Sequence, residues 1–140
     1  MHAALTLADR VGITVPLASH LPYTRRILRS YGLEHFVTGI NPIGIYGTDI
    51  KSRKAEIFDI TTRLIRSLVD EGAEIIVPLG GALIPYVVDP ADLTAATGVQ
   101  VLNTKAICVR FAEMCVNFKM TQSALTYPRG KLTSEDFTRP

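Results

Sequence analysis

The sequence of 140 residues lacks several features that identify large classes of proteins. Its net charge is only +2 and no run of lysine and arginine is longer than two residues, so electrostatic binding of nucleic acid is not expected. No apolar stretch reaches the roughly 18 to 20 residues of a membrane span. The first residues show no basic segment followed by an apolar core, so no signal peptide is expected. The sequence therefore favours a cytoplasmic protein that binds neither nucleic acid nor membrane.

Cysteine and histidine are also scarce. The two cysteines, Cys108 and Cys115, lie in one segment with a helical pattern. Their spacing is about 10 Å along a helix axis, which is too far for a disulfide. We interpret them as apolar residues on one helix face. The three histidines are scattered and no Cys-x-x-Cys pair is present, so we expect no metal site.

Apolar residues, in contrast, are plentiful. They make up 47% of the sequence, and the mean hydropathy is +0.22. A chain of this length and composition can build one packed domain, and disorder is not expected. We assign residues 1–120 to a single lobe and residues 121–140, which contain two prolines and a glycine, to an irregular C-terminal tail.

Short apolar runs alternate with segments of helical periodicity four times along the chain. The predicted strands are 11–15, 36–40, 73–77 and 99–102, and the predicted helices are 23–31, 51–71, one that begins at Pro90 with Asp89 as its cap, and 105–119. Asn41 and Pro42 are expected to stop the second strand. This alternation predicts an α/β fold of three layers, with a parallel sheet of about four strands covered by helices on both faces.

Ligands of such sheets bind beyond the carboxyl ends of the strands. That rule selects segments 15–19, 40–49, 79–83 and 103–105. The candidate substrate-binding residues in these segments are Val15, Ser19, Gly80, Gly81, Asn103 and Thr104. We identify no catalytic residue, because no cysteine, Gly-x-Ser-x-Gly motif or pair of carboxylates stands at these strand ends.

Each candidate has a structural alternative. Gly80 and Gly81 either present backbone N–H groups to an oxyanion or simply make a tight turn, and neither a Walker loop nor a Gly-x-Gly-x-x-Gly motif is present. Asn103 and Thr104 either donate hydrogen bonds to a bound acid or belong to a helix start in which Thr104 is the N-cap. His20 is either an acid–base group or a surface residue. The charged residues at the start of the second helix are interpreted as a solvated face: Asp49, Lys51, Arg53 and Lys54.

Four stretches in this order resemble the aspartate/glutamate/hydantoin racemase superfamily, and most closely its hydantoin racemase branch. They are residues 1–10 leading into the strand 11–15, residues 31–33 (YGL), residues 71–81 (EGAEIIVPLGG), and residues 98–103 (GVQVLN) followed by a helix with Ala112-Glu113-Met114. The likeness covers residues 1–118. It implies a flavodoxin-like lobe and a cofactor-independent isomerase that removes a proton α to a carbonyl. The implied ligand is a small carboxylate or a cyclic amide.

The chain departs from the family pattern at two places. Family members have two lobes, and typically one cysteine from each lobe transfers the proton; the position of the second-lobe cysteine holds Gly80 here. The likeness also corresponds to the second lobe only. We therefore expect a partial or catalytically degenerate racemase that forms a homo-oligomer or pairs with a partner lobe. The alternative is a non-catalytic module that binds a small carboxylate.

Overall fold

The computed structural model describes residues 1–127. The chain divides into two compact units, Met1–Cys108 and Val109–Pro140. The first unit contains the whole sheet and the start of the last helix. The described part of the second unit continues that helix and then forms turns as far as residue 127, while the remainder of the predicted tail lies outside the described residues.

The elements follow the predicted alternation. In chain order they are α1 (His2–Leu5), β1 (Val11–Val15), the 3-10 turn η1 (Ala18–His20), α2 (Leu21–Ser30), η2 (Glu34–Phe36), β2 (Val37–Pro42), α3 (Lys54–Asp70), β3 (Ile75–Pro78), α4 (Pro90–Thr97), β4 (Gln100–Val101) and α5 (Thr104–Asn117). The Asp89 carboxylate accepts a hydrogen bond from the Ala91 N–H, which confirms Asp89 as the cap of α4.

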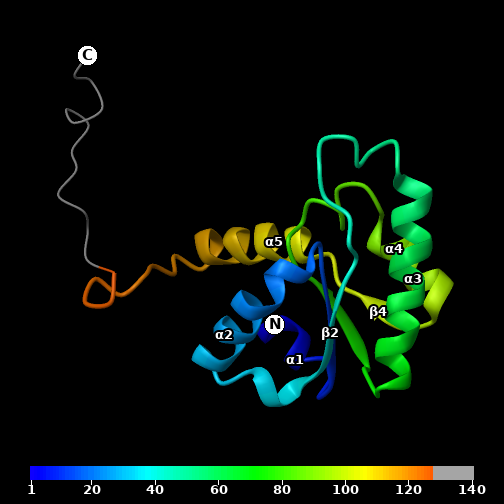
Figure 1. The fold of residues 1–140 in the computed structure, drawn as a ribbon. Coiled ribbons are helices and arrows are strands. Elements are labelled where there is room, and N and C mark those ends of the chain that lie inside the picture. Colours follow the sequence, from blue (N-terminus) through cyan, green and yellow to red (C-terminus); the bar gives the residue numbers. More distant parts are fainter. Residues whose placement is uncertain (128–140) are drawn as a thin grey trace. The chain divides into compact units, whose positions relative to one another are not determined.

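The four strands form one parallel sheet in the order β2-β1-β3-β4. Helix α2 connects β1 to β2, α3 connects β2 to β3, and α4 connects β3 to β4. This order is that of the flavodoxin-like doubly wound fold. The predicted fold class, a parallel sheet of about four strands with helices on both faces, is therefore confirmed (Figure 1).

Two apolar cores cover the two faces of the sheet. On one face, Ile57, Ile65 and Leu68 of α3 and Leu93 of α4 pack with Ile76. On the other face, α1 and α2 contribute Ala4 and Leu28, which pack with side chains of β1 and β3 such as Val11, Ile13 and Val77. Burial on both faces explains why the central strands are continuously apolar rather than alternating.

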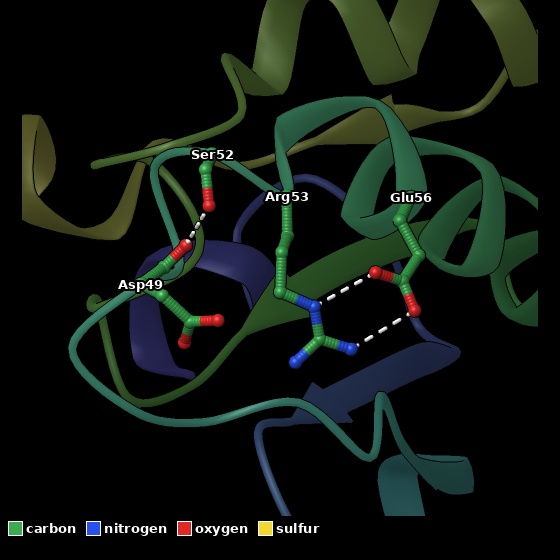
Figure 2. A network of polar contacts seen from close by, with 4 residues as sticks. All are labelled: Asp49, Ser52, Arg53 and Glu56. Atoms are coloured by element: carbon green, nitrogen blue, oxygen red, sulfur yellow. Dashed lines mark hydrogen bonds and ion pairs between the residues drawn. The ribbon is translucent and has the colours of Figure 1, made fainter.

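Several predicted boundaries differ from the structure, and two of these differences have a clear physical reason. Strand β2 does not stop at Ile40 but continues through Asn41 and Pro42, and Pro42 pairs with Val15. Because β2 is an edge strand, a proline with no N–H to donate is tolerated there. The second predicted helix begins at Lys54 rather than Lys51. Residues 49–53 instead form a turn in which the Ser52 hydroxyl donates to the Asp49 carbonyl at 2.7 Å (Figure 2).

The interpretation of the cysteines as packed apolar residues is wrong for Cys108, which is exposed, while Cys115 is half-buried. No residue of α5 is fully buried. Several large apolar side chains from this helix and the residue after it are exposed: Val109, Phe111, Met114, Val116 and Phe118.

Candidate functional site

A cavity of about 620 Å³ opens at the carboxyl ends of β1 and β3. That volume lies in the range of pockets that hold small organic ligands. Val15 and Pro16 reach it from the end of β1, Leu79 and Gly80 from the end of β3, and α2 closes one side. All of the lining residues belong to the first unit: Met1, His2, Val15, Pro16, His20, Tyr23, Thr24, Ile27, Leu28, Tyr31, Leu33, Leu79 and Gly80.

The cavity wall is mainly apolar, with a few polar groups along it. Thr24, Tyr23 and His20 supply hydroxyl and imidazole groups, whereas Ile27 and Leu28 supply hydrocarbon. The His20 ring stands edge-on to the ring of Tyr46, with 6.4 Å between centroids. Such a wall suits a compact ligand with an apolar or planar body and a small number of hydrogen-bonding groups.

Gly80 has a backbone that only glycine adopts readily. Its φ is +99°, and an added Cβ would lie 2.8 Å from Cγ of Pro16. A cysteine at this position would therefore suffer both backbone strain and a steric clash. A side chain at this turn would therefore require a change in its backbone path or a shift of Pro16.

Gly81 lies next to Lys105, which belongs to a group of side chains outside the cavity wall. Its φ is +56°, and an added Cβ would lie 2.9 Å from Cε of Lys105. The Lys105 ammonium stands 5.4 Å from the centroid of the Tyr86 ring, and the Lys51 ammonium stands 5.1 Å from the same centroid. Two cations from distant parts of the chain therefore meet at one phenol beside the glycine turn.

The hydrogen bond from Lys51 lowers the pKa of Tyr86, and the positive charges of Lys51 and Lys105 act in the same direction. The same hydrogen bond raises the pKa of Lys51. Both effects favour the pair of an ammonium and a phenolate. The side chains of this group are exposed, with 56% of Tyr86 accessible to solvent.

The six predicted site residues do not all lie together in the structure. Val15 and Gly80 line the cavity together. Gly81 lies against Lys105. Ser19 belongs to η1, is exposed, and does not contribute to the cavity wall.

Asn103 and Thr104 stand at the start of α5. The Asn103 side-chain oxygen accepts a hydrogen bond from the Ala106 N–H at 2.9 Å, so Asn103 is the capping residue and Thr104 is the first residue of the helix. The alternative in which Thr104 is the N-cap is therefore wrong. Asn103 supplies an acceptor to the first turn, and its oxygen is occupied by this bond.

The sequence predicted binding residues at the strand ends. It did not predict the residues that α2 and the loops contribute to the cavity wall and to the group around Tyr86. Tyr23, Thr24 and Tyr31 line the cavity from α2 and the residue after it. Tyr86 comes from the segment between β3 and α4, and Lys51 comes from the turn before α3, where a solvated face was expected. Only Lys105 lay in a selected segment. No periodicity marks the path of such turns, so the sequence gives no signal that they converge.

Within residues 1–127, no three His, Cys, Asp or Glu side chains gather in a group that could hold a metal ion. In the same part of the chain, no helix has both the length and the apolar character needed to cross a membrane.

Solved structures with the same fold come from allantoin racemases. The allantoin racemase of Pseudomonas fluorescens superposes with a TM-score of 0.82 at 18% sequence identity, over 95% of this chain and 56% of that one. The allantoin racemase of Klebsiella pneumoniae superposes with a TM-score of 0.77 at 25% identity, over 97% of this chain and 56% of that one. The chain thus spans little more than half the length of either. No family model and no curated protein matches the sequence.

These structural neighbours support the resemblance to the hydantoin racemase-like superfamily. They are racemases by name, and they share with this chain the parallel sheet whose carboxyl edge carries the cavity.

Proposed function

We propose that this chain is one lobe of a racemase-like protein and that it binds a small carboxylate or a cyclic amide at the carboxyl edge of its sheet. The observation that carries the proposal is the cavity between the ends of β1 and β3, which Val15 and Gly80 line. The likeness to allantoin racemases supports the class of ligand, since allantoin is itself a cyclic amide. We retain Ser19, Gly81, Asn103 and Thr104 as proposed binding residues that lie outside the cavity wall itself.

The proposed reaction is removal and return of a proton α to a carbonyl, without a cofactor. Inversion at that carbon needs a base on one face and an acid on the other, together with donors for the enolate. Gly80 provides neither an acid nor a base. We therefore propose that the chain alone is catalytically incomplete, and its coverage of 56% of each structural neighbour agrees with a role as one lobe of two.

Exchange of the α-proton with solvent tests this activity directly. Allantoin, hydantoin derivatives, aspartate and glutamate are each incubated with the chain in D₂O, and deuterium at the α-carbon is measured by NMR. We expect no exchange above the buffer rate for the chain alone. Exchange that depends on the chain and is lost when ligand binding is blocked would show that it carries a complete set of acid and base.

A second candidate function is a non-catalytic module that binds a small carboxylate. The positive φ of Gly80 favours it, because the turn is built around glycine rather than around an acid–base side chain. Thermal-shift measurements with small acids and cyclic amides test binding without any assumption about catalysis. A ligand at 100 times its Kd should stabilise the fold by about 2.7 kcal/mol. If none of these ligands raises the Tm, both candidate functions fail.

The same proposal includes a partner surface on α5, through a second copy of this chain or another lobe. Val116 of α5 and Phe118, which follows the helix, are 78% and 75% accessible to solvent. Exposed apolar side chains of this size are often buried when two proteins associate. Both cysteines are free thiols, in agreement with a cytoplasmic location.

A further inference from the structure

The group formed by Lys51, Tyr86 and Lys105, which we call the lysine–tyrosine cluster, has no role in the proton chemistry proposed above. Its members come from the turn before α3, the segment between β3 and α4, and the first turn of α5. Both ammonium groups lie within 5.4 Å of the centroid of the Tyr86 ring. Three separate elements thus bring two positive charges and one phenol hydroxyl to the same place.

The two lysines have no carboxylate partner in the described part of the chain. Within residues 1–127, the four ion pairs all use arginine: Arg25 and Arg29 with Glu34, Arg53 with Glu56, and Arg110 with Glu113. Each ammonium group lies close to the same ring, and the aromatic face offsets only part of its positive charge. A bound anion would balance that charge.

The turn that carries Lys51 is held in place by its neighbours. Arg53 donates two hydrogen bonds to the Glu56 carboxylate, at 2.8 and 2.9 Å, and the Ser52 hydroxyl donates to the Asp49 carbonyl (Figure 2). The nearest arginine is therefore already paired with an acid. Lys51, two residues earlier, remains directed to Tyr86.

Lys105 is positioned from the other side by the glycine turn. Its Cε lies only 2.9 Å from the position that a Cβ at residue 81 would take, so Gly81 leaves room for the side chain on its way to Tyr86. The preceding residue, Gly80, lines the cavity. The cluster and the cavity therefore meet at two consecutive residues of one turn.

We propose that the lysine–tyrosine cluster binds an oxyanion, a carboxylate or a phosphate, and so selects acidic ligands for the adjoining cavity. Lys51 and Lys105 supply charge-assisted hydrogen bonds, and the Tyr86 hydroxyl donates a third. The selection of acidic ligands rests on the proposed function, whereas oxyanion binding itself does not. The ligand would have a compact cyclic or apolar body in the cavity and an acidic group on the cluster.

Binding of inorganic phosphate tests the cluster without any cavity ligand. Affinity is measured by titration at constant ionic strength for the wild type and for Lys51→Gln, Lys105→Gln and Tyr86→Phe. Lys54→Gln is the matched control, since Lys54 is exposed and follows the same turn but makes no contact with Tyr86. Each cluster lysine variant should lose about threefold to tenfold in affinity, while Lys54→Gln should bind as the wild type does.

A spectroscopic readout separates binding at the cluster from binding elsewhere. Tyr86 is isolated as the difference between the phenolate absorbance of the wild type and that of Tyr86→Phe. Phosphate between the lysines should raise the pH at which Tyr86 ionises, because it neutralises the charges that favour the phenolate. Unchanged Tyr86 ionisation, or equal phosphate affinity in Lys51→Gln, Lys105→Gln and Lys54→Gln, would overturn the proposal.

Paired ligands distinguish the source of the oxyanion. Acetate and phosphate are compared as free ions, and hydantoin is compared with hydantoin-5-acetic acid. The acid should bind more tightly than its neutral parent, and Lys105→Gln should abolish that advantage. If the neutral parent binds and its acid gains nothing, the selection of acidic ligands by the cluster fails while the proposed function stands. If phosphate binds through the lysines and no cyclic amide binds, the cluster stands as an oxyanion site and the proposed function fails.

Discussion

At the scale of single residues, Gly80 decides what this strand-end turn can do. Its φ of +99° and the 2.8 Å approach of an added Cβ to Pro16 are two separate obstacles to a side chain. Gly80→Ala should therefore destabilise the fold by about 1–3 kcal/mol, the cost of a strained backbone conformation at a residue other than glycine. Chemical denaturation of the variant measures this difference.

Gly32 supplies the control for that measurement. It also has a positive φ, +67°, but an added Cβ would have no atom within 4 Å. Gly32→Ala thus carries the backbone cost alone, and it should destabilise the fold less than Gly80→Ala does. Equal losses of stability in the two variants would mean that the contact with Pro16 relaxes freely.

The ionisation of Tyr86 should make the stability of the fold depend on pH. The hydrogen bond from Lys51 lowers its pKa, so the folded protein binds the Tyr86 proton less tightly than the unfolded chain does. The stabilisation is then present above the unfolded pKa of tyrosine and is lost as the pH falls through the lower folded value. In an absorbance titration Tyr86 should ionise below the ordinary tyrosine value of about 10.

Lys51→Gln should move the ionisation of Tyr86 back towards that ordinary value, because it removes the hydrogen bond and the nearer charge. Lys54→Gln, which alters the net charge equally, should leave the pKa of Tyr86 as it is in the wild type. A titration in which both variants behave as the wild type does would show that Lys51 does not contact the phenol in solution.

The sequence predicted the edge of the sheet at which the cavity opens, together with two residues of the cavity wall. Val15 and Gly80 follow from the rule that ligands bind at the carboxyl ends of parallel strands, and the structure brings these two together around the cavity. The meeting of Lys51 with Tyr86 does not follow from it. Both residues lie in segments without periodicity, and the turn at residues 49–53 is held by local hydrogen bonds that no apolar pattern marks.

At the scale of elements, the start of α5 gives a prediction about Asn103. Its side-chain oxygen caps the helix through the Ala106 N–H. Asn103→Ala should cost about 1 kcal/mol of stability, which is typical for loss of an N-cap. Asn103→Asp keeps an acceptor at the same place and adds a negative charge at a helix N-terminus, so it should retain most of the stability.

The same two variants separate the capping role from a role in ligand binding. A residue that only caps the helix should leave phosphate affinity nearly unchanged when alanine replaces it in a chain that still folds. If Asn103→Ala keeps its Tm and loses ligand affinity, the side-chain amide contacts the ligand and the capping role is minor. Thermal melts with and without phosphate distinguish these results.

Elements with a clear periodicity were predicted well, and elements at an edge were not. Strand β1 has the predicted bounds because the run Val11–Val15, rich in β-branched residues, is bounded by Arg10 and Pro16. Strand β2 continues through Pro42 because its outer side faces no further strand, and only the sheet order reveals that. Proline is thus a weaker stop signal on an edge strand than its missing N–H suggests.

At the scale of the whole molecule, the apolar side chains of α5 bear on association. Val109 and Phe111 are 57% and 58% exposed, in a chain that spans 56% of the length of either structural neighbour. Covering one such side chain contributes about 1.5–3 kcal/mol when burial is complete. Burial of several such side chains in one interface would favour association, against its cost in translational and rotational freedom.

We therefore expect the wild-type chain to self-associate, with a mass in light scattering that rises with protein concentration. The double variant Phe111→Ser/Met114→Ser, which changes two exposed residues on one face of the helix, should shift this mass towards that of the monomer. Leu7→Ser is the matched control, since Leu7 is 62% exposed but lies outside α5. If the variant of α5 and the control associate equally, another surface makes the contact. A wild type that stays monomeric at every concentration would contradict self-association. The partner that covers α5 would then be a different lobe. Co-expression with a racemase lobe that supplies the proposed acid and base tests that alternative.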